Sequence, residues 1–400
     1  MLELSKHPWL KYVLFGDLYF SEGLIFATTT IIIVLFFTDK DISISTTTFV
    51  GGIASIPWML KFIFGPTIDF FGKYGRKVFI MIGGIIGSIS IFIVSVIDPK
   101  TYIMPFTALL FISHSGIVFI DVSADAWAIQ TSKINERGKV NAAMFTGLFA
   151  GTAIGGILLS FIATYFGFEM VFIITSSLIF LSLILPLFVR EKKIYIQRKK
   201  IKSLLIKEFK KRNTQIVIIL MFISGVNFGM LIFIIPEFVT NVLLLDKIQV
   251  GLLTAVYPIS IVIGSLIGGS IADKFGRKKI IFITLIILLI STVLLVTVDS
   301  WEKLAVIYGS IGVLTGASLY SSMGALMMDV TNPKLGGAQY SIIASIANFG
   351  ELGIAAFSGS LVVLLGYNRF FLYTALTVGI SLFVLYFVKE TCSKESLSDS

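Results

Sequence analysis

Long apolar runs are the feature that most constrains this chain. Nearly every stretch between its polar loops is apolar over about 20 residues or more, the length that an α-helix needs to cross a bilayer. Only 14% of the residues are charged, against roughly 25% in soluble domains. Helices and closed barrels satisfy their backbone polar groups in lipid, and the sequence has no alternating ten-residue segments of the barrel type. An all-α membrane protein is therefore predicted.

The apolar runs predict twelve transmembrane helices. Their expected bounds are 12–37, 45–68, 78–97, 102–130, 140–165, 169–189, 214–241, 248–272, 280–298, 304–328, 338–365 and 370–388.

Positive charges predict the orientation of these helices. Of the 32 Lys and Arg residues, 26 lie in the termini and in the loops after even-numbered helices, and five lie in the odd-numbered loops. Lys61 is the only one inside a predicted helix. Because positive loops stay in the cytoplasm, both termini are expected there, in a plasma or inner membrane. The net charge of +9 is thus an orientation signal, and no nucleic-acid partner is expected.

A basic segment divides the chain. Residues 190–212 hold eleven Lys and Arg residues and two Glu residues. We expect an amphipathic linker on the anionic inner leaflet, with a regulatory partner site as the alternative. The predicted organisation is an N-terminal six-helix half (1–190), a cytoplasmic linker (191–213), a C-terminal six-helix half (214–388) and a polar cytoplasmic tail (389–400).

The two halves repeat each other at a spacing near 200 residues. A constant offset of 199 relates three pairs of glycines: Gly138 and Gly337, Gly151 and Gly350, Gly167 and Gly366. Two equivalent halves imply a pseudo-symmetric bundle with a central seam. In such bundles the substrate binds between the halves near mid-membrane, and the halves rock to expose it alternately.

The loops after helices 2 and 8 carry related sequences. Residues 65–77 read GPTIDFFGKYGRK, and residues 269–279 read GSIADKFGRKK. Both resemble the signature loop of the major facilitator superfamily, and the first departs from it by three extra residues before its Gly-Arg-Lys. The resemblance covers the whole chain. It implies two pseudo-symmetric six-helix bundles that transport a small solute.

Further motifs resemble the muropeptide permease and acetyl-CoA transporter branch of that superfamily. They are residues 56–66 with the long loop that follows, 19–23, 121–127, 136–138 with 141–143, and 329–333 with 339–341. This resemblance does not fix the substrate.

The signature loops are predicted to form a cytoplasmic gate. Asp69 and Asp273 end helices there and can face the N-terminal dipole of a neighbouring helix. The basic residues can pair with carboxylates or lipid phosphates, or can simply anchor the topology; they are Lys73, Arg76, Lys77, Arg277 and Lys278.

Two carboxylic acids stand near the middle of helices that border the central cavity in the superfamily. Glu22 lies in helix 1, near Asp17 and Tyr19, and Glu351 lies in helix 11. Ionisable groups at the centre of a membrane helix cost at least about 2.5–3.5 kcal/mol, so they usually face a cavity or a partner. Each acid can exchange a proton, bind a cationic part of a substrate, or simply hydrogen-bond to a neighbouring helix.

Helix 4 carries His114, Asp121 and Asp125 on one face. This stripe would suit a proton path. The alternative is that the two aspartates, Asp125 above all, pair with Lys61 or with the first signature loop, while a neutral His114 donates to a backbone carbonyl. Lys61 is expected either to snorkel toward water or to bind an anionic group of a substrate.

Other polar groups lie on helices expected to line the cavity: Asn227, Glu237, Tyr257, Tyr320 and Asn348. Pro236 is expected to break helix 7 and free a backbone carbonyl. Small-residue spacing predicts close packing inside each half. It is carried by Gly147, Gly151, Gly155 and Gly156 on helix 5, and by Gly264 and Gly268 on helix 8.

These features predict a monomeric secondary active transporter for a small solute, proton-coupled as a symporter or antiporter, with drug or metabolite efflux as an alternative direction. The sequence has no Walker-type phosphate loop, so ATP is not its expected energy source. With two His and one Cys (Cys392), no enzyme activity, cofactor or metal is expected. A membrane enzyme or a sensor on a transporter fold remains the alternative from another class.

Overall fold

The computed structural model describes residues 4, 8–70, 74–131, 137–191, 201–331 and 336–389, and its elements are helical. Eleven helices in this part of the chain are long and apolar enough to cross a membrane. One of them, residues 143–188, contains two spans that meet at Gly167, where φ 82° and ψ 169° are not helical. The described residues therefore form twelve spans, and the predicted all-α fold is confirmed.

The first six spans pack together as the N half. They are α1 (Pro8–Ala27) with a π-helical segment (Thr28–Ile32) and α2 (Ile33–Asp39), α3 (Ile44–Met59) with α4 (Lys61–Phe70), α5 (Arg76–Val94), α6 (Ile103–Thr131), and the two arms of α7 (Arg137–Ser182), the second continued by α8 (Ile184–Phe188).

The last six spans pack as the C half. They are α10 (Arg212–Ile232) with α11 (Ile234–Asn241), α12 (Lys247–Phe275), α13 (Arg277–Leu294), α14 (Trp301–Thr315) with a π-helical segment (Gly316–Met323) and α15 (Gly324–Asp329), α16 (Gly336–Leu365), and α17 (Tyr367–Tyr386).

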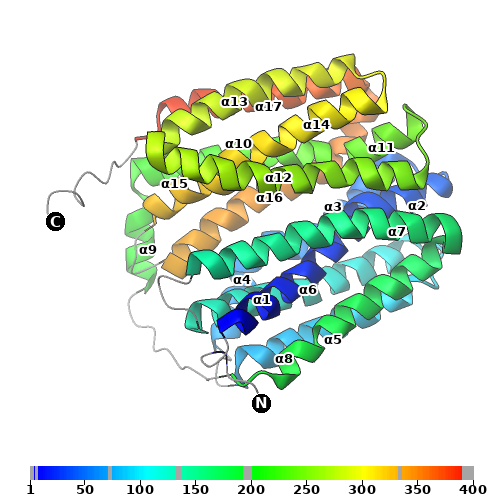
Figure 1. The fold of residues 1–400 in the computed structure, drawn as a ribbon, viewed down its shortest axis with the longest axis horizontal. Helices are drawn as coiled ribbons and strands as arrows, with labels where there is room; N and C mark the ends of the chain where they lie inside the picture. Colours follow the sequence, from blue (N-terminus) through cyan, green and yellow to red (C-terminus); the bar gives the residue numbers. More distant parts are fainter. Residues whose placement is uncertain are drawn as a thin grey trace, which may run out of the picture.

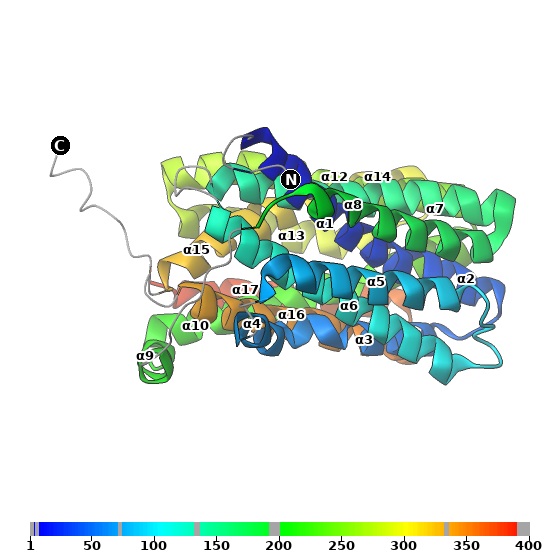
Figure 2. The ribbon, with the colours of Figure 1, turned by 90° about the horizontal axis from the view of Figure 1, so that it is seen from below.

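The two halves lie side by side with their helices running along the same direction (Figure 1). The short helix α9 (Ile201–Phe209) lies across one end of this bundle, as both views show (Figures 1 and 2). This end, with the loops after even-numbered spans, is called the even-loop end below, and the opposite end is called the odd-loop end.

Four glycines with positive φ mark equivalent points in the two halves. Gly167 and Gly366, at φ 82° and 75°, join spans 5 to 6 and 11 to 12. Gly75 and Gly276, both at φ 93°, precede α5 and α13. Side chains disfavour this backbone region, so glycine is needed at each turn. These positions agree with the predicted repeat.

Most of the predicted small-residue contacts lie inside one half. A Cβ on Gly147 or Gly151 would overlap the backbone of α1, and one on Gly264 would overlap the backbone of α14. Gly156 differs, because its neighbours include Ile31 of its own half and Gly251 of the C half.

Small residues also bring the two halves together at the odd-loop end. A Cβ on Gly52 of α3 would overlap Ala356 of α16, so these helices are in direct backbone-to-side-chain contact. Nearby, the backbone N–H of Gly359 donates to Thr48 Oγ1 at 3.3 Å.

An ion pair reinforces this contact between the halves. Lys247, at the start of α12, pairs with Asp39 at the end of α2, and its ammonium lies 4.6 Å from the centre of the Phe168 ring. The structure is therefore closed at the odd-loop end.

Asp98, in the next odd-numbered loop, has a pKa below its usual range because Lys40 and Thr101 donate hydrogen bonds to it.

Two details of the helices bear on the sequence predictions. Helix 7 breaks at Phe233, as expected from Pro236, because proline lacks an N–H and its ring clashes with the carbonyl four residues earlier. The prediction that Lys61 is the only basic residue in a span is wrong, because span 1 begins at Trp9 and includes Lys11, which is 5% exposed.

Candidate functional site

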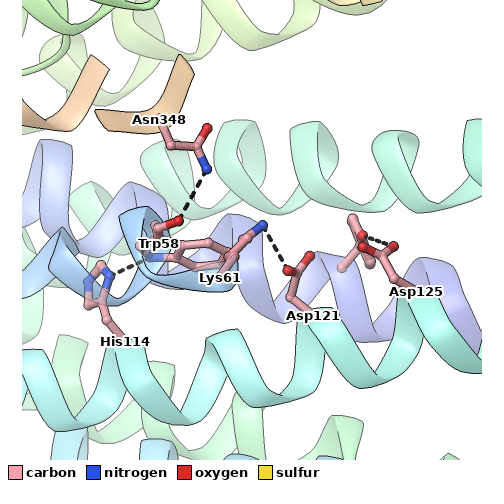
Figure 3. A network of polar contacts seen from close by, with 7 residues as sticks. Trp58, Lys61, His114, Asp121, Asp125 and Asn348 are labelled. Atoms are coloured by element: carbon pink, nitrogen blue, oxygen red, sulfur yellow. Dashed lines mark hydrogen bonds and ion pairs between the residues drawn. The ribbon is translucent and has the colours of Figure 1, made fainter. Parts of the chain in front are cut away.

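Lys61 lies at a break in helix 2 inside the bundle. α3 ends at Met59, Leu60 has φ −91° and ψ 11°, and α4 begins at Lys61. The ammonium of Lys61 is 2.7 Å from Asp121 Oδ2 and 4.5 Å from the centre of the Trp58 ring (Figure 3). The side chains of Lys61 and Asp121 are 23% and 2% exposed. Lys61 therefore binds a carboxylate within the bundle and does not snorkel to the surface.

Asp125 has a different partner from the one predicted. Tyr19 Oη of α1 donates to Asp125 Oδ1 at 2.6 Å, and Lys61 pairs with Asp121 instead. Asp125 is one turn beyond Asp121 on α6, and this turn places it opposite the phenol of α1. Asp125 is exposed, whereas Asp121 and Tyr19 are buried.

Glu22 adds a third carboxyl to this group. It interacts electrostatically with Asp121, Lys61 and Asp125, and its side chain hydrogen-bonds to the Asp121 carboxyl. Its Oε2 atom is buried and receives no N–H or O–H donor among the described residues. A buried carboxyl oxygen without such a donor is costly, so this oxygen is a candidate contact for a proton or a substrate.

The C half brings three polar residues to the same place. Asn348 of α16 donates from Nδ2 to the backbone carbonyl of Trp58 at 3.4 Å, across the seam (Figure 3). Glu351, one turn further along α16, interacts electrostatically with Lys61. Tyr320, in the π-helical segment of span 10, interacts electrostatically with both Glu351 and Glu22.

Aromatic rings surround these groups. The Tyr320 ring is 5.4 Å from the Phe149 ring and 6.5 Å from the Phe145 ring, both on α7 of the N half. Phe145 also lies 6.4 Å from Tyr19.

These polar residues form one group at the contact between the halves. The seam cluster consists of Tyr19, Glu22, Lys61, Asp121, Asp125, Tyr320, Asn348 and Glu351. It holds four carboxyl groups and one ammonium group.

The seam cluster is accessible although it lies inside the bundle. Asp125 is exposed, and Glu22, Lys61 and Glu351 are partly exposed. The odd-loop end is closed above them, and Asp125 belongs to the part of α6 that runs toward the even-loop end. The most exposed carboxyl of the cluster thus lies on its even-loop side.

His114 does not face the carboxyl groups that share its helix. Its Nδ1 accepts from Trp58 Nε1 at 2.8 Å (Figure 3). Its Nε2 lies 2.8 Å from Thr29 Oγ1. An indole N–H can only donate, so Nδ1 carries no proton and the ring is neutral. The expected partner of a neutral His114, a backbone carbonyl, is replaced by the Thr29 hydroxyl, which donates onward to the Ile25 carbonyl.

Replacing His114 with Phe should destabilise the N half. The phenyl ring occupies a volume similar to that of the imidazole but leaves Trp58 Nε1 and Thr29 Oγ1 without this partner. We therefore expect the free energy of unfolding to fall by about 1–3 kcal/mol. Thermal unfolding of the purified protein in detergent measures it. Ser115→Ala is the matched control, because the Ser115 hydroxyl bonds only its own helix, at the Phe111 carbonyl. Equal stability of the two variants would contradict a structural role of His114.

Several other predicted residues lie away from the seam cluster. Asn227 donates to the Thr374 carbonyl at 3.2 Å, between α10 and α17 inside the C half. Glu237, near the odd-loop end, accepts hydrogen bonds from Tyr367 and Asn241.

Tyr257 and Asp17 are likewise outside it. Tyr257 stacks between Phe228 and Tyr308 and donates to Thr315 Oγ1 at 3.3 Å, although it interacts electrostatically with Glu351. Asp17 is half-buried on α1, one turn toward the even-loop end from Ser21, whose hydroxyl lies 3.4 Å from the Asp17 carbonyl.

Two signature-loop lysines bind backbone carbonyl groups at the end of a later span. Lys77 Nζ donates to the carbonyls of Leu187 and Val189, at the end of span 6. Lys278 Nζ donates in the same way to the carbonyls of Tyr386 and Val388, at the end of span 12. Carbonyls at a helix C-terminus lack intrahelical partners, and a cation satisfies them. Each lysine thus holds together helices of its own half.

Glu191 completes the first signature loop and was not predicted from the sequence. Its carboxylate accepts from the backbone N–H groups of Arg76 and Lys77, at 2.5 and 3.0 Å, and so caps the N-terminus of α5. A Cβ at Gly75 would collide with this carboxylate. An acidic residue immediately after the sixth apolar run was the available signal.

The remaining signature-loop residues are described only in part. Lys73 lies outside the described residues, and so do the side chains of Asp69 and Asp273. Arg277 begins α13, next to Gly276.

Comparisons with known proteins agree with this architecture. The family model described as Major Facilitator Superfamily matches residues 18–221 and 217–398. A steroid transmembrane transporter of Rattus norvegicus is 33% identical over 107 residues, which are 26% of this chain and 19% of that protein. The matched region thus spans about a fifth of that relative.

Solved structures share the fold over nearly the whole chain. A D-xylose–proton symporter gives a TM-score of 0.77 at 16% identity, covering 95% of this chain and 98% of that one. A variant of the nucleoside transporter NupG gives 0.77 at 14% identity, covering 95% and 100%. The E. coli xylose transporter XylE, inward open, gives 0.74 at 16% identity, covering 95% and 97%. The chain belongs to the Major Facilitator Superfamily of membrane transporters.

Proposed function

We propose that this protein is a proton-coupled secondary active transporter whose protons and small-molecule solute meet at the seam cluster. The observation that carries the proposal is the imbalance of charge there. One ammonium group faces four carboxyl groups in the interior of a membrane bundle, and Asp121 already neutralises that ammonium. Glu22 and Glu351 are less exposed than Asp125, and ionising them without cations is costly in a medium of low dielectric constant, so these two carboxyls are suited to take up and release protons.

Alternating access follows from the two ends of the bundle. The odd-loop end is closed, and we infer that the seam cluster is reached from the even-loop end, toward which the exposed Asp125 lies. Opening the other side requires breaking the Asp39–Lys247 ion pair and separating Gly52 from Ala356, both of which join the two halves. Rocking of the halves about the cluster would exchange one set of contacts for another. We place the even-loop end in the cytoplasm, because the positive loops lie there.

We infer a division at the basic linker 191–213, a polar tail at 389–400 and a monomer in the bilayer. Within the superfamily we place the chain beside the muropeptide permease and acetyl-CoA transporter branch, on the motifs of spans 1, 2 and 4. Placement beside these two kinds of transporter does not specify the transported solute.

Glu22→Gln should abolish uphill transport, while solute-for-solute exchange should persist at saturating solute concentration. Glutamine keeps the shape but cannot carry the proton, so accumulation driven by a pH gradient stops, whereas solute-for-solute exchange needs no net proton movement. The solute for this assay is first identified by a thermal-shift screen of the purified protein against metabolite classes. Uptake and counterflow are then measured in proteoliposomes. Full accumulation by the variant under a pH gradient would contradict a coupling role for Glu22.

A further inference from the structure

The one cation of the seam cluster is already committed. Lys61 holds Asp121 at 2.7 Å, and its ammonium lies on the face of Trp58. An anionic solute would have to displace a carboxylate that is 2% exposed, and would then face the remaining carboxyl groups. Removing the partner of a buried charge is strongly unfavourable. The arrangement therefore disfavours an anionic solute, contrary to one of the two roles that the sequence left open for Lys61.

Carboxyl groups stand on both sides of the seam, and the basic residue that acts on them in the described part of the chain is Lys61, which already pairs with Asp121. Glu22 approaches from α1 and Glu351 from α16, and Tyr320 interacts electrostatically with both of them. Glu22 Oε2 is buried and receives no N–H or O–H donor among the described residues, and the side-chain hydrogen bond of Glu22 joins it to another acid, Asp121. A positive group placed between these two acids would supply the missing charge and a donor to Glu22 together.

The surrounding rings suit the rest of such a solute. Phe145 is 37% exposed although it lies at the contact between the halves, and Phe149 and Tyr320 pack beside it. Aromatic faces attract cations, and aromatic cages bind quaternary cations in this way. Aromatic rings also bury the apolar groups of a ligand, and an alkali-metal ion or a simple amine lacks such groups.

We propose that the seam cluster binds an organic cation with an apolar or aromatic body, held between Glu22 and Glu351 and exchanged for protons on these carboxyl groups. This proposal rests on the proposed transport function and specifies its substrate class. The charge balances if one monovalent cation binds as one proton leaves. Other groups that bear on this exchange are Tyr19, Asp121, Asp125 and Lys61 from the N half, and Tyr257 and Tyr320 from the C half.

Two probes of nearly the same shape and opposite charge test the substrate class. Tetraphenylphosphonium should bind the purified full-length protein saturably in equilibrium dialysis, and tetraphenylborate should bind about tenfold more weakly or worse. In weakly buffered solution with a pH indicator, binding of the cation should release close to one proton. Equal binding of the anion, or binding of the cation with no proton release, would overturn the proposal.

Variants identify the carboxyl groups. Glu351→Gln and Glu22→Gln should each weaken tetraphenylphosphonium binding by about tenfold or more, the ratio that corresponds to one lost charged contact of about 1.4 kcal/mol. Glu302→Gln is the matched control, because Glu302 is exposed at the start of α14, and its affinity should stay within about twofold. Unfolding temperatures verify that each variant is folded. Unchanged affinity in both folded acid variants would refute this site.

The failure of this proposal differs from the failure of the transport function. If tetraphenylphosphonium does not bind but xylose, uridine or another neutral solute does and is taken up by proteoliposomes, the protein is a transporter with another substrate class. If cysteines placed at the two ends of the bundle show no alternating accessibility with any solute, transport itself is refuted.

Discussion

Lys61→Met is expected to abolish most of the folded protein in the membrane, because it destabilises the fold. The substitution keeps the volume of the stem but leaves Asp121, 2% exposed, without its cation. Removing one partner of a buried ion pair costs about 3–5 kcal/mol, a large part of the stability of a typical protein. The yield of monodisperse protein after detergent extraction, and its unfolding temperature, measure the effect.

The double variant Lys61→Met with Asp121→Asn separates the pair from the lysine itself. It removes both charges, so the unpaired carboxylate disappears and most of the lost stability should return. Met still covers the Trp58 ring that the lysine stem and ammonium covered. A double variant as unstable as Lys61→Met alone would show that the lysine acts through other contacts than Asp121.

Gly52→Val should hold the odd-loop end open. A Cβ at Gly52 would already overlap the Cβ of Ala356, and a valine adds two further methyl groups at the contact between the halves. The closed end cannot form without a shift of the helices, so the population moves toward the opposite conformation. Cysteines on the odd-loop side of the seam should label several-fold faster with a membrane-impermeant maleimide, and the seam cluster should become protected from the even-loop side.

Two glycines provide the comparison for this experiment. Gly353, on α16 near Ala356, has open space where a Cβ would lie, with no neighbouring atom within 4 Å, so Gly353→Ala should leave the labelling pattern unchanged. At Gly229 a Cβ would overlap the Glu351 carbonyl inside the C half, so Gly229→Ala should lower stability without favouring one conformation. A labelling pattern for Gly52→Val that matches that of Gly353→Ala would contradict a closing contact at Gly52.

The helices were predictable because each is long, apolar and bounded by polar loops. The bounds of spans 3 and 12, expected at 78–97 and 370–388, agree within a few residues with Arg76–Val94 and Tyr367–Tyr386. Local patterns of this kind depend only on hydrophobic length and on helix-breaking residues. The break at Pro236 was predictable for the same reason, whereas Gly167 and Gly366 were predicted only as equivalent positions of the repeat and not as turns.

The partners of the buried polar groups were less predictable. The sequence placed Asp121 and Asp125 on one face of α6, but the rotation of α1 against α6 decides that Tyr19 reaches Asp125 while Lys61 reaches Asp121. A single helix contains no information about that rotation, which depends on how the neighbouring helices pack. For the same reason nothing in the sequence connected His114 with Trp58.

The contacts of Lys77 and Lys278 with backbone carbonyl groups have a mechanical consequence. Lys77 fastens the start of span 3 to the end of span 6, and Lys278 fastens the start of span 9 to the end of span 12, so each half is tied across its own even-loop end. A half tied in this way resists splaying when its contacts with the other half are broken. When a bound solute moves the helices at the seam, the whole half then moves with them as one rigid body. The covalent linker between the halves need not transmit this movement.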